Sequence, residues 1–285
     1  MDIINNKKII SQHSKSFFWA SRFLPRDVLG KVINIYSYCR LHDDIVDEGK
    51  EITESEKMQD LKDIIQSYGV SQEIIQQLID GIYSDKNFQR FKNTEELIRY
   101  CYKVAGVVGL MMTKALNINN NDAKYYAIDL GIAMQLTNIS RDVIQDYKKQ
   151  RIYLPKDTGI LDEDVCNLNY SDKIKLKKVI HNLLIKSDIY YNSALNGLRY
   201  IPIRSRLSIL IALRMYQSIG KKIKKTNIEF LEENIYITVI EKLLILINCI
   251  FEFIIFFILP TYSKKHNSNL HKFLKGLPDV NFKKI

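Results

Sequence analysis

Two acidic segments, far apart in the chain, carry the residues whose types and spacing could support chemistry. In the first, IYSYCRLHDDIVDEG, Asp43 and Asp47 lie four positions apart, so both project from one face of a helix. Arg40 and Tyr36 continue that face towards the N-terminus. The second segment, AMQLTNISRDVIQD, places a matching set on one helical face, namely Gln135, Asn138, Asp142 and Asp146.

Like charges at this spacing destabilise an isolated helix by about a few tenths of a kcal/mol per pair. A single acidic face is usually just solvated, but two matched faces flanked by apolar residues favour a bound cation. Carboxylate and amide oxygens without His or Cys are the ligands that Mg²⁺ prefers, with Mn²⁺ as an alternative. The sequence therefore predicts a magnesium site between the two segments.

The neighbouring basic residues indicate what such a metal would hold. Magnesium commonly bridges one or two carboxylates to substrate phosphates. Arg40 and Arg141 could then bind phosphate oxygens through two hydrogen bonds each. His42 lies beside the first acidic face, and we interpret it as a packing or supporting group. The set predicts diphosphate binding.

Other functional classes find little support. The chain has no GxxxxGK[ST] loop, no GxGxxG after a strand, no GxSxG and no HExxH. Its formal charge of +10 suits an anionic partner. The basic residues are dispersed, without a long basic arm or zinc-finger spacing, so we expect no nucleic-acid partner.

Helical periodicity dominates the sequence, which has only 11 glycines and 5 prolines. We expect an all-α fold in which residues 1–285 form a single continuous helical bundle. The longest irregular connection runs from Gln150 to Asn169. The expected helices span 27–48, 54–67, 71–84, 94–116, 120–149, 171–198, 202–223 and 234–259.

The cysteines and the two ends of the chain bear on location. Four cysteines without a CxxC pair are interpreted as buried free thiols in a reducing compartment. The N-terminus lacks signal-peptide features, so a cytoplasmic protein is expected. The segment from Leu243 to Leu259 is apolar except for Asn248 and Glu252. We interpret it as a buried helix lining the core, with peripheral contact at a membrane surface as the alternative.

Four stretches carry a resemblance to a known family. They are HSKSFFWASRFLP (13–25), YCRLHDDIVDE (38–48), YCYKVAGVVGLMMT (100–113) and QLTNISRDVIQDYKKQRIYLP (135–155). In order and spacing they resemble the squalene and phytoene synthase family, and the third resembles its phytoene synthase branch in particular. The match covers nearly all of the chain as far as Tyr216.

The resemblance implies an isoprenoid-synthase helical bundle around a deep apolar cavity. It implies that two prenyl diphosphates condense head to head through a cyclopropyl diphosphate, with release of diphosphate. By motif, the metal ligands would be Asp43, Asp47, Asn138, Asp142 and Asp146. Catalytic roles would fall to Tyr36, Arg40, Asp43, Asp47 and Asp142. The diphosphate and intermediate would be bound by His13, Ser14, Lys15, Ser16, Tyr36, Arg40, Tyr102, Gln135, Arg141 and Tyr216.

Several of these residues could instead have a purely structural role. Tyr36 and Tyr102 could be core aromatics, Gln135 and Asn138 could cross-link helices, and Lys15 with Ser16 could begin a helix. The sequence also departs from the family after Tyr216, where a basic stretch is expected. FLEENIYITVIEKL stands there instead, with Glu232, Glu233 and Asn234 at the expected basic positions.

Three functions remain open on the sequence. The first is phytoene synthesis from C20 diphosphates. The second is squalene or dehydrosqualene synthesis from C15 diphosphates, of which squalene alone would need NADPH. The third is a non-catalytic scaffold of the same fold, which the intact acidic residues argue against.

Overall fold

The computed structural model describes residues 15–48, 55–167, 169–227, 231, 235–258 and 263–282. Every regular element within these ranges is a helix, so the all-α prediction is confirmed. In chain order the α-helices are α2 (Lys15–Ser21), α3 (Arg26–Glu48), α4 (Ser55–Ser67), α5 (Gln72–Tyr83), α6 (Thr94–Cys101), α7 (Val107–Ala115), α8 (Ala123–Arg141), α9 (Val143–Lys148), α10 (Asp162–Asn167), α11 (Tyr170–Leu195), α12 (Ile203–Lys225) and α13 (Val239–Ile258).

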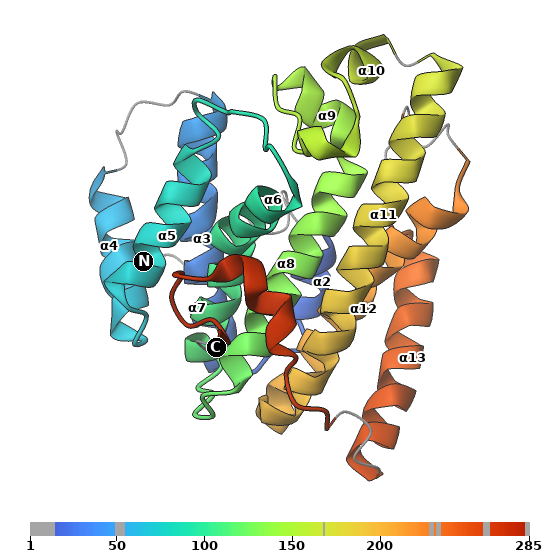
Figure 1. Cartoon of the computed structure of the whole chain (residues 1–285). Coiled ribbons are helices and arrows are strands. Elements are labelled where there is room, and N and C mark those ends of the chain that lie inside the picture. Colours follow the sequence, from blue (N-terminus) through green and yellow to red (C-terminus); the bar gives the residue numbers. More distant parts are fainter. Residues whose placement is uncertain are drawn as a thin grey trace.

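Helix α8 occupies the centre of the bundle, with α11 and α12 on one side and α7 on the other (Figure 1). Helix α13 lies along α12 at the edge of the molecule, and residues 263–282, which contain the 3₁₀ helix η5 (Ser268–Leu274), cross over α6 and α8. Buried aliphatic and aromatic side chains from most of these helices form one continuous core. Three of the described α-helices begin at polar N-caps, whose side chains accept a backbone N–H: Ser71, Asn93 and Asn169.

Glycines allow α8 to approach its neighbours closely. A Cβ atom on Gly131 would lie 2.2 Å from the carbonyl oxygen of Ala105, and one on Gly109 would lie 2.2 Å from that of Ala127. Only a residue without a side chain fits at either crossing. The two glycines therefore set the spacing between α8 and the 102–115 segment.

Two of the expected helices are interrupted. The expected helix 94–116 contains a π-helical turn, η1 (Tyr102–Gly106), between α6 and α7. The expected helix 120–149 bends at Asp142, whose φ of −102° and ψ of 14° separate α8 from α9. The backbone bonds from Asp142 N to Asn138 O and from Asp146 N to Asp142 O persist, so the acidic residues still share one face. Periodicity cannot reveal either interruption, because both keep the side chains close to helical register.

Three smaller expectations need correction. The connection from Gln150 to Asn169 is not irregular throughout, since it contains the 3₁₀ helix η2 (Lys156–Thr158) and α10. The expected helix 171–198 ends in the 3₁₀ helix η3 (Asn196–Tyr200). Of the cysteines expected to be buried, Cys39 is half-buried and Cys166 is exposed.

Helix α13 also differs from the expected buried helix. Its large aliphatic and aromatic side chains are exposed along most of its length, and Cys249 is the residue that is buried against the bundle. Among the described residues, none of the helices combines the length and the apolar character that a membrane crossing requires.

Candidate active site

A polar cavity of about 250 Å³ lies where the two acidic helical faces meet. It collects the five predicted metal ligands, which come from α3 and from the α8–α9 bend. They are Asp43, Asp47, Asn138, Asp142 and Asp146. Gln135 and Arg141 of the predicted set line the same cavity. The helical periodicity therefore identified side chains that do converge.

An apolar cavity of about 340 Å³ adjoins the polar one. Its wall is made mainly of aliphatic side chains from α3, α7, α8 and α12, with Tyr36 and Tyr216 among them. Four residues line both cavities: Asp43, Val104, Gln135 and Asn138. A hydrocarbon chain in the apolar cavity would thus end directly at the carboxylates.

The carboxylates of the polar cavity are partly buried from solvent and repel one another. Burial, assisted by the charges of Asp47 and Asp85 and opposed by Arg40, raises the pKa of Asp43 to about 7. Burial and the charge of Asp142 likewise raise the pKa of Asp146 to about 7. Without a counter-charge, these two groups would hold protons near neutral pH.

Asp47 has a different environment. Lys149 and Arg151 donate hydrogen bonds of 2.8 and 2.7 Å to its two oxygens. Burial acts to raise the pKa of Asp47, but these two bonds outweigh it and lower the pKa. Gln150 adopts a left-handed conformation with φ of 61°, and the Arg151 N–H returns to Asp146 O, so the chain reverses after α9 and directs Arg151 back to the cavity.

Both predicted arginines pair with a neighbouring acid. Arg141 donates two hydrogen bonds, of 2.6 and 2.5 Å, to the carboxylate of Asp142. These bonds raise the pKa of the Arg141 guanidinium further, although burial acts in the opposite direction. Arg40 forms an ion pair with Asp44 one turn along α3. Arg40 is not among the residues that line either cavity, so in this structure it acts on Asp43 and Tyr36 through its charge.

Comparison with known proteins agrees with this architecture. A family model described as "Squalene/phytoene synthase" matches residues 10–67 and 53–241. The chain belongs to the squalene/phytoene synthase family. A phytoene synthase of Pseudescherichia vulneris is 31% identical over 245 residues, covering 74% of this chain and 79% of the relative. A 15-cis-phytoene synthase of Pantoea ananas is 30% identical over 267 residues, covering 82% and 86%.

A solved structure of a dehydrosqualene synthase in complex with a ligand superposes with a TM-score of 0.75 at 24% identity. The alignment covers 87% of this chain and 95% of that one. This likeness establishes the fold that the squalene/phytoene synthase family shares. The predicted isoprenoid-synthase bundle is therefore confirmed.

Membership of the squalene/phytoene synthase family implies a divalent metal for diphosphate binding. The residues present fit such an ion. All the donors are hard oxygens, and two of them, Oδ1 of Asn138 and Oδ1 of Asp85, are buried without a hydrogen-bond partner. A bound cation would satisfy these oxygens and offset the repulsion at Asp43 and Asp146.

Sequence reasoning missed several residues of the cavity. Asp85 follows α5 and accepts hydrogen bonds from the hydroxyls of Tyr100 (2.8 Å) and Tyr153 (2.9 Å). Burial raises the pKa of Asp85 despite these two bonds. Arg151 and Tyr153 lie in the QRIYLP end of the family motif, which was the available signal. Asp85 lies outside every family stretch that the sequence displays, and only the fold brings it to the site.

Tyr102, like Arg40, is a predicted site residue that lines neither cavity. Tyr102 is fully buried, and its hydroxyl donates a 2.6 Å hydrogen bond to Pro278 O. The π-helical turn that starts at Tyr102 presents Val104 and Ala105 to the apolar cavity instead. His42 behaves as a packing group, with its ring edge-on to Tyr38 and its pKa lowered to about 4 by burial.

The remaining predicted residues cannot be placed. His13 and Ser14 lie outside the described residues, and the side chains of Lys15 and Ser16 are likewise outside the description. Glu232, Glu233 and Asn234, at the expected basic positions of the family, also fall outside it.

Proposed function

We propose that this protein condenses two C20 prenyl diphosphates head to head into phytoene, through a cyclopropyl diphosphate, with release of diphosphate. The observation that carries the proposal is the shared wall of the two cavities, because it joins a hydrocarbon site to a carboxylate site. Relatives named phytoene synthase, at 30% and 31% identity, support the C20 substrate.

In this proposal Asp43, Asp47, Asn138, Asp142 and Asp146 would hold magnesium. The ion, when bound, supplies positive charge to the leaving diphosphate and so favours its departure from the allylic carbon. Asp85 is a further candidate, because its unpartnered oxygen lies in the same cavity. Manganese would suit the same oxygens.

Protein cations complete the diphosphate site. Three basic residues line the polar cavity, and each forms an ion pair with a predicted metal ligand: Arg141, Lys149 and Arg151. If that acid held a metal, the basic side chain would be available to bind a phosphate oxygen. A bidentate arginine contact then adds orientation as well as charge.

The apolar cavity protects the reactive carbon. An allylic cation is quenched by water, so its chain must react where water is excluded. Tyr36 and Tyr216 line the cavity, and their aromatic faces can stabilise the cation. Burial, opposed by the nearby charge of Arg40, keeps the pKa of the Tyr36 hydroxyl well above its usual value. Tyr36 therefore stays protonated and can donate a hydrogen bond to an anion.

The proposed chemistry balances without a redox cofactor. The carbon–oxygen bond of the first diphosphate breaks, the double bond of the second substrate attacks the cation, and a proton is lost as the cyclopropane closes. Ionisation of the second diphosphate and loss of one more proton give a conjugated C40 triene. NADPH is required only if the product is squalene.

The test is product analysis with purified protein and Mg²⁺. C15 and C20 diphosphates are supplied separately, with and without NADPH, and the lipids are identified by mass spectrometry. We expect a C40 hydrocarbon without NADPH. A C30 product alone would replace the proposal by squalene or dehydrosqualene synthesis, and a folded protein without any product would favour the scaffold.

We also propose peripheral contact of α13 with a lipid bilayer. Apart from Asn248, the exposed side chains among its described residues are apolar, from Val239 and Ile240 through Ile247 and Phe251 to Ile255. Its two acidic residues each pair with a basic residue of α12, Glu241 with Lys222 and Glu252 with Arg214. Because both acids are paired with α12, the outer face of α13 is a mainly apolar patch of the kind that marks an interaction site.

Charge and substrate chemistry favour a bilayer as the occupant. Lys264 and Lys265 are exposed just beyond α13, and the whole chain carries a formal charge of +10, so anionic lipid would be attracted. Helix α12, which packs against α13, lines the hydrocarbon cavity, so the contact would bring the lipid phase close to that cavity.

The test is flotation with vesicles of phosphatidylglycerol and phosphatidylcholine. Ile247→Asp with Phe251→Asp should abolish flotation. Ile185→Asp with Ile189→Asp, at exposed apolar positions of α11, is the matched control and should float like the wild type. If the wild-type protein is a monomer and does not float with the vesicles, the membrane contact is contradicted. If it is a dimer that the α13 substitutions dissociate, the apolar face of α13 instead binds a second copy of the chain.

A further inference from the structure

The apolar cavity runs along α8 from the carboxylates towards the start of that helix. Its α8 wall includes Asn138 and Gln135 at the polar end and Tyr126 and Ala123 at the other. At a rise of about 1.5 Å per residue, Tyr126 and Asn138 are separated by about 18 Å along α8. Leu116 of the α7–α8 connection and Gly197 of η3 line the same far end.

This length can be compared with a prenyl chain. An extended peptide advances about 3.5 Å for three backbone bonds, and an extended carbon chain advances about as much. The 16-carbon main chain of a C20 prenyl group then reaches about 18 Å, and the 12-carbon main chain of a C15 group reaches about 13 Å. A C20 chain that starts beside Asn138 would therefore reach Tyr126, and a longer one would have to pass the Tyr126 side chain.

The contacts of Tyr126 hold it firmly. Its hydroxyl donates a 2.8 Å hydrogen bond to Lys264 O, and its ring lies edge-on to the ring of His266 at 5.3 Å. A Cβ on Gly197 would come within 2.4 Å of the Tyr126 Cβ, so η3 closes on it from another side. Two of these contacts come from the C-terminal segment 263–282 and not from the bundle.

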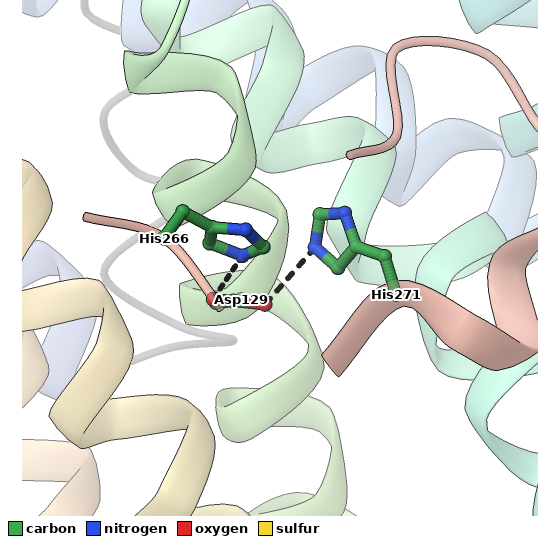
Figure 2. Close-up of side chains that lie close together, drawn as sticks. All are labelled: Asp129, His266 and His271. Atoms are coloured by element: carbon green, nitrogen blue, oxygen red, sulfur yellow. Dashed lines mark hydrogen bonds and ion pairs between the residues drawn. The ribbon is translucent and has the colours of Figure 1, made fainter. Parts of the chain in front are cut away.

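A buried carboxylate fastens that segment to α8, as Figure 2 shows. One oxygen of Asp129 lies 3.0 Å from Nε2 of His266, and the other lies 3.1 Å from Nε2 of His271. The three side chains are at most 2% exposed. Burial acts to raise the pKa of Asp129, but the hydrogen bonds of both histidines outweigh it and lower the pKa. We call these three residues the clasp.

The hydrogen bond at Nδ1 of His271 distinguishes a hydrogen-bonded cluster from a metal site. The backbone N–H of Asn281 donates to Nδ1 of His271 at 2.8 Å, so this nitrogen carries no proton and Nε2 must. A neutral histidine that binds a metal through Nε2 instead donates its Nδ1–H to an acceptor. Although the three groups have ligand-like spacing, His271 is arranged to donate to Asp129 rather than to bind a metal.

We propose that the clasp is a positioning device for the tunnel floor: Asp129, His266 and His271 fix the C-terminal segment, which holds Tyr126 in place and limits the prenyl chain to about C20 length. The inference rests on the proposed function, which it deepens by assigning the residues that set substrate length. Asp129 acts through Tyr126 and touches no substrate.

The test compares C20 and C25 prenyl diphosphates in three variants. Tyr126→Ala removes the floor and should raise the ratio of kcat/KM for C25 over C20 at least tenfold. Asp129→Asn weakens the clasp and should raise the same ratio at least threefold. Lys124→Ala is the control. It removes the 2.7 Å ion pair with Asp279 of the same C-terminal segment and the contact of Lys124 with the Tyr125 ring, but no hydrogen bond of the clasp or of Tyr126, so its ratio should match the wild type.

A binding measurement makes the test independent of turnover. The Kd values of non-reactive C20 and C25 thiolodiphosphates are measured calorimetrically with Mg²⁺. In Tyr126→Ala and in Asp129→Asn, the affinity for the C25 compound should rise relative to that for the C20 compound. Circular dichroism checks folding, and His266→Gln replaces Asp129→Asn if the latter is unfolded. Unchanged C25-to-C20 ratios in folded Tyr126→Ala and Asp129→Asn overturn the inference. It is also overturned if the wild type retains stoichiometric zinc after treatment with a chelator and His271→Gln does not.

The two proposals fail in different ways. If the wild type forms no hydrocarbon but the thiolodiphosphate ratios still shift, the tunnel floor stands and the proposed reaction is wrong. If C40 hydrocarbon forms and neither ratio moves, the reaction stands and the assignment of the clasp is wrong.

Discussion

Arg151 donates a 2.7 Å hydrogen bond to Asp47, although 104 positions separate them. The bond joins the turn that follows the second acidic segment to the end of the first, and both residues line the polar cavity. We expect Arg151→Gln to raise the KM for the prenyl diphosphate at least tenfold, because a charged hydrogen bond to phosphate is lost. The half-saturating Mg²⁺ concentration should not rise, since a competing cation beside Asp47 is removed.

Steady-state kinetics at several Mg²⁺ concentrations would separate these effects. Lys175→Gln is the control, because Lys175 is a half-exposed lysine that pairs with Asp164 outside the two cavities. An Arg151→Gln enzyme with an unaltered KM would show that Arg151 only orders the empty site.

The acids themselves should matter more. Asp47→Asn and Asp142→Asn each replace a charged oxygen by a neutral amide with almost the same shape. We expect either variant to cut kcat at least about a hundredfold, the scale of a lost electrostatic contribution. Asp63→Asn on α4, an exposed carboxylate that accepts from Gln59, should retain full activity. Near-normal turnover in either cavity variant contradicts the metal role of that residue.

Metal removal should change the pH dependence of stability. The pKa values of Asp43 and Asp146, about 7, lie above the ordinary value of 3.8, so the metal-free folded protein binds protons more tightly than the unfolded chain. Their stabilising contribution is complete below about pH 4 and is lost as the pH rises through about 7. The Tm of EDTA-treated protein should therefore decrease as the pH is raised from about 4 to above about 7.

Added Mg²⁺ should reverse that loss, because it binds the deprotonated acids and favours the folded state. Differential scanning calorimetry at pH 5.5 and pH 8 should give the larger Mg²⁺-dependent increase in Tm at pH 8. Asp142→Asn should reduce this increase. An equal effect of Mg²⁺ at both pH values would argue against binding to these carboxylates.

The spacing of α8 from the 102–115 segment gives a prediction about stability. Gly131→Ala would place a methyl group against the Ala105 carbonyl, and the resulting strain should lower the free energy of unfolding by about 1–3 kcal/mol. Gly30→Ala, on α3 with no atom within 4 Å of the new Cβ, should instead raise it by about 0.5–1 kcal/mol. Urea denaturation of both proteins measures the two signs, and a neutral Gly131→Ala would mean that the crossing can relax.

The helical class and the two acidic faces follow from the order of the amino acids. Helical spacing places side chains on a face whatever the rest of the fold does, so Asp43 groups with Asp47 and Asn138 groups with Asp142 on spacing alone. Helical spacing also places Gln135 on the second face, and the position of Arg141 beside the acids predicts phosphate binding; the family motifs include both residues. These are local properties, and neither the bend at Asp142 nor the π-helical turn at Tyr102 disturbs the acidic faces.

The packing of whole helices determines which other groups share the cavities. Asp85 reaches the site because α5 packs against α3 and η1, and Tyr102 leaves it because its hydroxyl meets the Pro278 carbonyl. Asp129 lies on the same helix as the start of the second acidic segment, yet its partners His266 and His271 come from a segment with no local signal. Contacts between residues so distant along the chain depend on how the helices pack in three dimensions, and a periodic pattern carries no information about that.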